Sequence, residues 1–448
     1  MSRLIHFYHK AHAAARAWRQ PARPGARIVR WLIAASLLVL YLRFMLLFGY
    51  NYQGTFTMDL PSYYTASEVA FNQRLSPYDL ALLQGQMEQR VHSYLYPPPS
   101  LLFFYPFSRV SYADAQLLLL AFNHGLVLLT AYMSIKALRL SLNGSGVKIG
   151  LLLGYFFCFT PIVMTLKYGQ VGLLLLALLL GFWLSARSNR PLLAGALLAG
   201  AIALKAYPAL LLPLLLVSRR YREALATVAW SVALLAVAAL ALPAQVWSDW
   251  LFKVIPVGGY GRLPAELGSP AQPWNVALYG FIGRLFVDTE QTRAPFIHAN
   301  SQATAIVLAY LGVAALIGAS MAVIARASRR SADTSIDQIM IIGLPLMFLA
   351  APLSWMHHGV HLLPAILAHL VAGPRLAPWS RMIYWLLIGA IAAALATETL
   401  VFYFPAVAGL WLINLLLVAR KQPIDAAPPD AATADSPESA VAPIGLAS

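Results

Sequence analysis

The stretch ATAIVLAYLGVAALIGASMAVIA, residues 303–325, decides the fold class, because it contains no charged side chain. A helix needs roughly 20 consecutive apolar residues to cross the hydrocarbon core of a bilayer. Similar apolar stretches occur at 28–50, 224–242 and 381–400. The sequence therefore predicts an all-α, polytopic transmembrane helix bundle.

The composition supports the same class. Of the 448 residues, 60% are hydrophobic and 11% are charged, whereas soluble domains contain about 25% charged residues. A net charge of +15 would indicate nucleic acid in a soluble protein. Here the basic residues flank apolar stretches, so we expect membrane lipids as partners and no nucleic acid. Cys158 is the one cysteine, which excludes intrachain disulfides and multi-cysteine zinc sites.

The spacing of the apolar stretches predicts about 12 transmembrane helices, within a range of about 10 to 13. The predicted spans are 28–50, 113–138, 148–166, 170–186, 191–205, 207–218, 222–243, 301–325, 336–353, 356–372, 381–399 and 401–419. If the basic segment 1–27 is cytoplasmic, most of the 32 Lys and Arg residues fall on its side of the membrane. The positive-inside rule requires this bias. We therefore expect a multi-pass protein of the bacterial inner membrane with both termini in the cytoplasm.

The predicted transmembrane domain, residues 28–420, carries two long outward loops. The first, 51–112, contains Ser62–Asn72 and Tyr78–His92, whose apolar residues recur at helical spacing. This pattern predicts short amphipathic juxtamembrane helices. The second loop, 243–300, is rich in Pro, Gly, Trp and Asn, and the tail 421–448 has the composition of a disordered cytoplasmic segment.

Asp59 is the first candidate for chemistry. It lies in TMDLPSYY, residues 57–64, shortly after the first predicted span. A carboxylate at the outer membrane face can accept a proton from a reacting hydroxyl that lies within hydrogen-bond reach. The alternative is a structural role as a helix N-cap or as a solvated loop acid.

Three cations are predicted at the outer ends of spans or in the outer loops, namely Lys167, Lys205 and Arg284. Ionisable groups at membrane depth are costly and usually face a cavity or a partner. A lipid phosphate is one such partner, because its negative charge grows when it departs as a leaving group. The alternative is that these side chains extend to the lipid headgroups.

His357 and His358 belong to a third cluster, in SWMHH at residues 354–358, with His361 one turn later. We expect these histidines to bind a phosphate by a hydrogen bond or to pack at the membrane interface. Metal binding is a weaker alternative, because no carboxylate follows at the spacing of a metal ligand. A further segment, YLYPPPS at residues 94–100, contains Tyr96 and three prolines that fix an extended chain.

Taken in order, several of these segments resemble glycosyltransferase family 87, a family of the GT-C membrane glycosyltransferases. The resemblance rests on Asp59 in the first loop, SPY at 76–78, YPP at 96–98, KYGQ at 167–170, LK at 204–205, Asn275 with Arg284, and SWMHH at 354–358. It covers about residues 30–420. The sequence departs from the family where it reads NVA at 275–277 in place of Asn-Gln-Ser.

The resemblance implies a GT-C fold in which the first outer loop covers the active site. It further implies an inverting transfer of a hexose, with mannose as the default, from a polyprenyl-phosphate donor to a glycolipid or glycan acceptor. Asp59 would be the general base. Gln170, Lys205, Arg284, Lys167 and His357 or His358 would surround the phosphate and sugar of the donor, and Tyr63, Tyr96 and Asn275 would belong to the acceptor side or its loops. No cofactor and no obligatory metal are expected, since the first loop has no Asp-x-Asp motif.

Two other readings stay open from the sequence. A transporter or flippase of lipid-linked sugars would require a pathway to both sides of the membrane, with broken helices and polar groups at mid-depth. A lipid-linked glycan polymerase or a pentosyltransferase would share the architecture. Many of the acids fall in the predicted outer loops, which favours an enzyme that works at the outer face.

Overall fold

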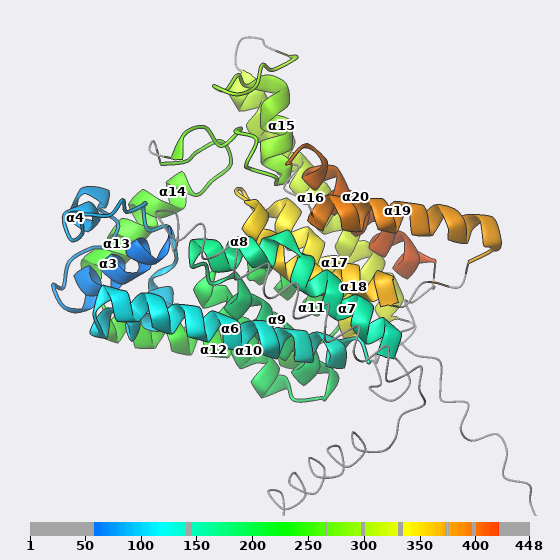
Figure 1. Cartoon of the computed structure of the whole chain (residues 1–448), viewed down its shortest axis with the longest axis horizontal. Coiled ribbons are helices and arrows are strands. Elements are labelled where there is room, and N and C mark those ends of the chain that lie inside the picture. The colour runs from blue at the N-terminus through cyan, green and yellow to red at the C-terminus, as the bar shows by residue number, and fades with distance from the viewer. Residues whose placement is uncertain are drawn as a thin grey trace, which may run out of the picture.

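A computed structural model describes residues 58–139, 146–264, 267–296, 301–329, 335–371, 374, 376–396 and 400–420 (Figure 1). The basic segment 1–27, the predicted first span 28–50, the start of the first outer loop and the tail 421–448 lie outside these residues.

Every regular element in the described ranges is a helix, and no strand occurs in them. In chain order the helices are α3 (Leu60–Phe71), α4 (Leu80–Gln84), η1 (Pro98–Ser100), α5 (Leu101–Phe104), η2 (Phe107–Arg109), α6 (Tyr112–Ala137), α7 (Gly146–Cys158), α8 (Thr160–Tyr168), α9 (Gly172–Arg187), α10 (Pro191–Leu204), η3 (Tyr207–Leu210), α11 (Leu211–Val217), α12 (Tyr221–Ala241), α13 (Ala244–Asp249), η4 (Trp250–Val254), α14 (Ile255–Val257), α15 (Leu278–Phe286), α16 (Ser301–Ser328), α17 (Ser335–Ala350), η6 (Met356–Leu362), α18 (Leu363–Val371), α19 (Pro378–Ala396) and α20 (Leu400–Ala419).

Two apolar helices, α9 and α17, form the centre of the bundle. Every side chain of α17 from Ile339 to Ala350 is buried, and α9 is buried along most of its length. A helix that is apolar on all sides must be enclosed by protein or by lipid. For these two helices the enclosure is protein, since α6 and α10 pack on α9 while α16 and α20 pack on α17.

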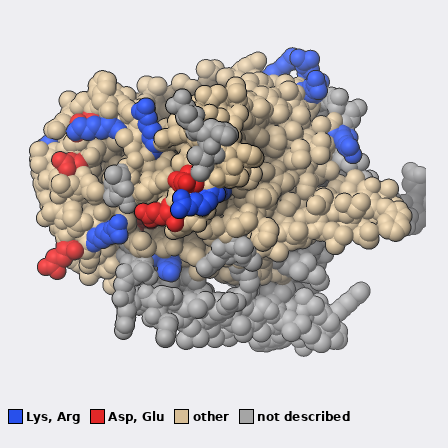
Figure 2. Space-filling view, turned by 90° about the horizontal axis from the view of Figure 1, so that it is seen from above, with Lys and Arg blue, Asp and Glu red and all other residues tan. Residues whose placement is uncertain are grey.

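Other helices expose apolar side chains to the surroundings. In the most apolar windows of α12 and α16, 22% and 17% of the residues are buried, and Leu240 is 88% exposed. Figure 2 shows that one face of the described molecule has few charged side chains. Continuous apolar surface on this scale is not stable in water. With α6, α12, α16, α19 and α20 all long and apolar enough to span, the protein is embedded in a membrane, as predicted.

Helices α10 and α12 approach one another unusually closely. A Cβ atom placed on Gly195 of α10 would lie 2.5 Å from the backbone carbon of Ala226 in α12. Small residues on both helices permit this contact, as they do in many membrane interfaces. The α6, α9, α10 and α12 helices lie side by side (Figure 1), and α10 leads directly to Lys205.

The two ends of the bundle are built from different groups of residues. At the end that we call the basic end, Asp337 accepts hydrogen bonds from the side chains of Arg187, Arg139 and Trp183, which join α9, α17 and the end of α6. At the opposite end, which we call the loop end, α3, α4, α13 and α14 gather (Figure 1).

Parts of the first loop differ from the prediction. Its first helix is present as α3, but most of its side chains are buried, including Tyr63 and Val69. α5 and η2 pack on α3, so this helix is enclosed by other parts of the first loop, and its position at the membrane surface stays a prediction. In the second predicted segment, Tyr78–His92, only α4 is helical.

The predicted spans agree with the helices in part. The span 148–166 is divided at Phe159 into α7 and α8, whereas the separately predicted spans 336–353 and 356–372 correspond to α17 and to the pair η6–α18, with the turn 351–355 between them. The segment 243–300, predicted to face outward, contains α13, the π-helix η4, α14 and α15 in its described residues. The predicted fold class is confirmed, whereas the total of about 12 spans stays a prediction, since the first span is outside the described residues.

Candidate active site

Asp59 stands at the N-cap position of α3, yet its side chain makes no capping hydrogen bond. Its backbone N–H donates to the carbonyl of Tyr168 at 3.1 Å, which attaches the first loop to the end of α8. The Nε2 atom of Gln170 donates to Oδ2 of Asp59. No hydrogen bond from a described residue reaches Oδ1, so this oxygen is available to a ligand.

Gln170 reaches Asp59 because α8 ends in a tight turn. Gly169 has φ +66° and ψ +32°, a left-handed conformation that glycine adopts without a steric penalty. The turn places the side chain of Gln170, which is 3% exposed, between Asp59 and two tyrosines. The hydroxyls of Tyr63 and Tyr96 lie 3.1 Å and 3.3 Å from its Oε1 atom.

Burial changes the acidity of Asp59. The surrounding protein excludes bulk water and raises the pKa of Asp59 from 3.8 to about 6, while the Gln170 hydrogen bond and the charge of Lys205 act in the opposite direction. An isolated carboxyl group in water is a weak base at neutral pH. A carboxylate with a pKa near 6 remains ionised at pH 7 and accepts a proton more readily.

Lys205 occupies the break between α10 and η3. Pro208 lacks the N–H that a continuous helix would require, and Lys205 itself is extended, with φ −144° and ψ +135°. Its side chain is 8% exposed, and its Nζ atom lies 5.4 Å from the ring centre of Tyr96. Among the described residues no carboxylate forms an ion pair with it, although the charge of Asp59 is near enough to affect it.

Trp355 ends the turn between α17 and η6, and His357 lies in the first turn of η6. Asn275 holds this turn, because its Nδ2 donates to the carbonyl of Pro352 at 3.2 Å and its Oδ1 accepts from the N–H of Ser354 at 3.1 Å. The Nε2 atom of His357 and the Nε1 atom of Trp355 are buried and have no hydrogen-bond partner in the described part of the chain. Unpartnered buried polar atoms are costly and often mark a ligand site.

These segments enclose a cavity of about 400 Å³, which we call the polar cavity. Its volume lies in the usual range for small-molecule sites, about 300–1,000 Å³. The polar side chains on its wall are Asp59, His92, Ser93, Tyr96, Gln170, Lys205, Tyr207, Arg262, Trp355, His357 and His358. Apolar residues line the rest, including Trp250 and Val254 of η4, Leu95 of the first loop and Leu353 of the turn 351–355.

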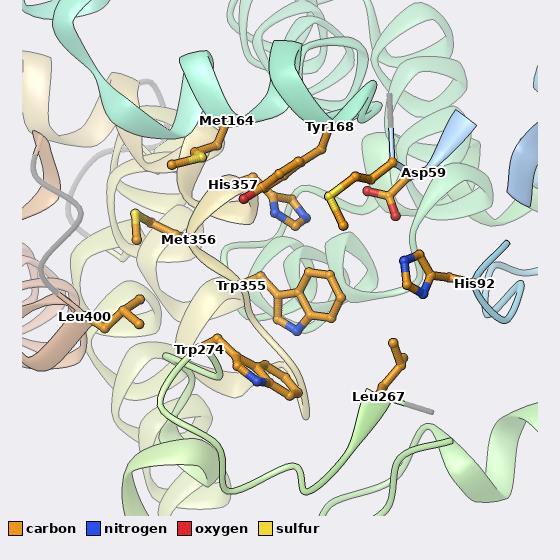
Figure 3. Close-up of a pocket in the computed structure, with 11 residues that line it drawn as sticks. Asp59, His92, Met164, Tyr168, Leu267, Trp274, Trp355, Met356, His357 and Leu400 are labelled. Carbon is orange, nitrogen blue, oxygen red and sulfur yellow. The ribbon is translucent and has the colours of Figure 1, made fainter. Parts of the chain in front are cut away.

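An adjoining cavity of about 490 Å³, which we call the aromatic cavity, shares five residues with the first, among them Asp59, His92 and His357. Figure 3 shows Asp59 facing the space between His92, His357 and Trp355. The indole rings of Trp274 and Trp355 meet edge to face, with their centres 5.4 Å apart. The remaining lining is apolar or aromatic and consists of Met58, Met164, Tyr168, Leu267, Met356 and Leu400.

The structure brings together five of the residues predicted to touch substrate, since Asp59, Gln170, Lys205, His357 and His358 all line the polar cavity. Tyr96, predicted on the acceptor side or its loops, also lines this cavity. Tyr63, predicted with it, does not line the cavity, but its hydroxyl donates to Oε1 of Gln170.

Three other predicted residues line neither cavity. Asn275 holds the turn described above, and Arg284 donates to the carbonyls of Gln272 and Asn275 at 3.1 Å and 2.9 Å. The Nζ atom of Lys167 lies 5.9 Å from the ring centre of Tyr168. Arg284 and Asn275 thus support the loop that carries Trp274, and a direct role for any of the three stays a prediction.

Sequence reasoning missed Arg262, His92 and the tryptophan pair. Arg262 follows a glycine-rich loop with no periodic pattern, and His92 ends a predicted helix that is not formed. His92 is held by Ser62 of α3, whose Oγ contacts both the N–H and the carbonyl of His92, at 3.0 Å and 2.8 Å. An aromatic pair separated by 80 residues in sequence leaves no local signal.

No group of three His, Cys, Asp or Glu side chains that could hold a metal ion occurs within the described ranges. That the reaction needs no metal or cofactor stays a prediction.

Comparison with known families decides the class. The model of glycosyltransferase family 87 matches residues 94–352, more than half of the chain. The chain belongs to glycosyltransferase family 87. The match includes Tyr96, Gln170, Lys205 and Arg262 of this membrane glycosyltransferase and begins after Asp59. No curated protein and no solved structure matches the glycosyltransferase.

Proposed function

We propose that this glycosyltransferase transfers a hexose, with mannose as the first candidate, from a polyprenyl-phosphate donor to a glycolipid or glycan acceptor. The reaction takes place at the outer face of the bacterial inner membrane, as a single displacement that inverts the anomeric centre. Asp59 is the general base. The observation that carries the proposal is one unpaired carboxylate oxygen in a cavity that also contains Lys205, Arg262 and His357.

The polar cavity is proposed to hold the donor. Lys205 and Arg262 supply positive charge, and the free Nε2 atom of His357 supplies a further hydrogen-bonding group. When the bond between the anomeric carbon and the phosphate oxygen breaks, its electron pair stays on the phosphate, whose charge increases. Fixed cations and donors that face this charge in a site shielded from water stabilise the transition state.

The aromatic cavity is proposed to hold the acceptor. Because Asp59 and His357 belong to both cavities, a base at their junction can take the acceptor proton while the acceptor oxygen bonds to the anomeric carbon. Inversion requires this oxygen to approach opposite the departing phosphate, so donor and acceptor must enter from different sides. The exposed faces of Trp274 and Trp355 suit the C–H faces of a sugar, and the three methionines suit an apolar chain.

The outward orientation is supported by charge. Arg139, Arg187 and Arg220 lie near the basic end, and the positive-inside rule places such an end in the cytoplasm. The loop end, with both cavities, would then face outward, where a lipid-linked donor is used without a nucleotide.

The test uses the purified protein in lipid nanodiscs with polyprenyl-phosphate mannose, the corresponding glucose donor, and a lipid extract of the source cells as acceptor. Mass spectrometry should find one added hexose with the wild type and none with Asp59→Asn. Asp79→Asn is the matched control, because Asp79 caps α4 by hydrogen bonds that asparagine can also accept, and it should retain full activity. An active Asp59→Asn variant would remove Asp59 from the role of base, and a wild type inactive with every lipid-phosphate donor would refute the donor class.

A further inference from the structure

The amide group of Gln170 makes contacts at both of its ends, and these contacts fix its orientation. Its Nε2 end faces Oδ2 of Asp59, and its Oε1 end faces the hydroxyls of Tyr63 and Tyr96. An ionised carboxylate only accepts hydrogen bonds, so the amide N–H must face it. The two hydroxyls lie 2.7 Å apart. One hydroxyl donates its proton to the other, and the second hydroxyl donates its own proton to Oε1 of Gln170.

We propose that Gln170 is a positioning residue for the base, fixed in turn by Tyr63 and Tyr96, and that it binds Oδ2 of Asp59 so that Oδ1 alone serves the acceptor hydroxyl. This inference rests on the proposed function, since it assigns a task to the same carboxylate. It differs from the role expected from the family resemblance, in which Gln170 contacts the donor.

The protein around this chain of contacts keeps it in one arrangement. The ring of Tyr63 stacks on Phe104 with centres 4.2 Å apart, and the Tyr78 hydroxyl donates to the carbonyl of Tyr96 at 2.9 Å. The backbone N–H of Gln170 donates to the carbonyl of Thr165 at 2.9 Å. Because backbone and rings are both anchored, the amide has little freedom to turn away from Asp59.

The chemical consequence concerns both proton transfer and acidity. As the acceptor oxygen bonds to the anomeric carbon and the bond to phosphate breaks, the acceptor proton moves to Oδ1. The hydrogen bond at Oδ2 favours the ionised carboxylate and so lowers the pKa of Asp59 against the effect of burial. The other groups around this carboxylate are Lys205, Tyr63 and Tyr96, which interact with its charge, and Arg262, His92, His357 and His358 on the cavity walls.

The first test is Gln170→Met, which keeps the volume and removes both hydrogen bonds. The acid limb of kcat/KM against pH should move upward by about one pH unit or more, the size expected for a hydrogen bond to a charged group. Tyr63→Phe with Tyr96→Phe should move the limb in the same direction by less. Combined with Gln170→Met, the two tyrosine changes should add no further shift, since they act through the amide.

The matched control is Tyr94→Phe. It removes a hydroxyl of the same aromatic cluster that pairs with Ser100 rather than with Gln170, and it should leave the limb where it is. A limb that stays in place in Gln170→Met while the donor KM rises would overturn the proposal and make Gln170 a donor contact. Shifts that add in the triple variant would also overturn it.

A second measurement keeps this inference separate from the proposed function. Infrared difference spectra between wild type and Asp59→Asn report the protonation of Asp59 in the protein without any substrate. The midpoint should rise in Gln170→Met and remain unchanged in Tyr94→Phe. An unchanged midpoint in Gln170→Met refutes the positioning role even if the enzyme transfers hexose, and a raised midpoint supports it even if every donor fails.

Discussion

The pH dependence of the wild type and of two Lys205 variants tests the electrostatics of the site most directly. Burial, opposed by the Gln170 hydrogen bond and the charge of Lys205, brings the pKa of Asp59 from 3.8 to about 6, a net difference of about 3 kcal/mol between its two protonation states. A base must be ionised to act, so the protonation of Asp59 should make kcat/KM fall on the acid side of this pKa. At pH 5 it should be about tenfold below its plateau.

Replacing the lysine should change both the position and the height of this profile. The charge of Lys205 lowers the pKa of Asp59, so Lys205→Met should move the acid limb to higher pH. The plateau should also fall, by roughly 10²–10³ if Lys205 faces the departing phosphate as donors in oxyanion holes face their charge. Lys205→Arg retains the charge, and its acid limb should stay near that of the wild type.

The assay measures hexose transfer in nanodiscs at donor concentrations well below KM, over a pH series at constant ionic strength. A phosphodiester donor carries the same charge across this range, so the limb reports the protein. A wild-type limb near pH 4 would show that Asp59 is solvated. A Lys205→Met profile that coincides with the wild type would place Lys205 away from both Asp59 and the phosphate.

Three further variants, two of them paired with a control variant, test how the fold holds the site. Gly195→Leu should lower the stability of the bundle by about 1–3 kcal/mol through overpacking, because a Cβ there would lie 2.5 Å from Ala226. In the control variant Gly200→Ala, the added Cβ would have its nearest contact at an ordinary 3.7 Å, so thermal unfolding in detergent should be unchanged. Equal melting temperatures for Gly195→Leu and Gly200→Ala would contradict the close approach of α10 and α12. Gly169→Val should reduce kcat at least tenfold in the transfer assay, because a β-branched residue rarely adopts φ +66°. Gly169→Asn should retain most of the activity. An active valine variant would show that the turn does not position Gln170. Asp337→Asn should lower stability by about 1–3 kcal/mol, since it weakens the hydrogen bonds that Arg187 and Trp183 donate, and a fluorescence melting curve that matches the wild type would refute this.

Much of the fold follows from apolar length and the distribution of basic residues. Those patterns predict helices, their approximate ends and a membrane setting, and they do so for α12, α16 and α20 within a few residues. They also place the break between the spans 336–353 and 356–372, but not the break at Phe159. That break depends on what the neighbouring helices offer to freed backbone groups, which is tertiary information.

The site was predictable in part. Residues placed by the ordered resemblance, such as Asp59, Lys205 and His357, do meet in one cavity. Arg284 and Asn275 form hydrogen bonds with backbone carbonyl and N–H groups of loops. Such contacts cannot be predicted from the sequence, because nearly every residue has the same backbone groups. Arg262 contributes from a loop without periodicity, so only the folded chain brings it to the cavity.

The attachment of Asp59 to the end of α8 through its backbone N–H has a consequence for engineering and for natural variation. The position of the carboxylate is set by the membrane bundle rather than by the length of the loop that carries it. Added residues at the exposed segment 84–86 would enlarge the loop at little entropic cost and would leave the carboxylate in place. An epitope or a fluorophore tag inserted there would report which side of the membrane the loop end occupies while the protein continues to function.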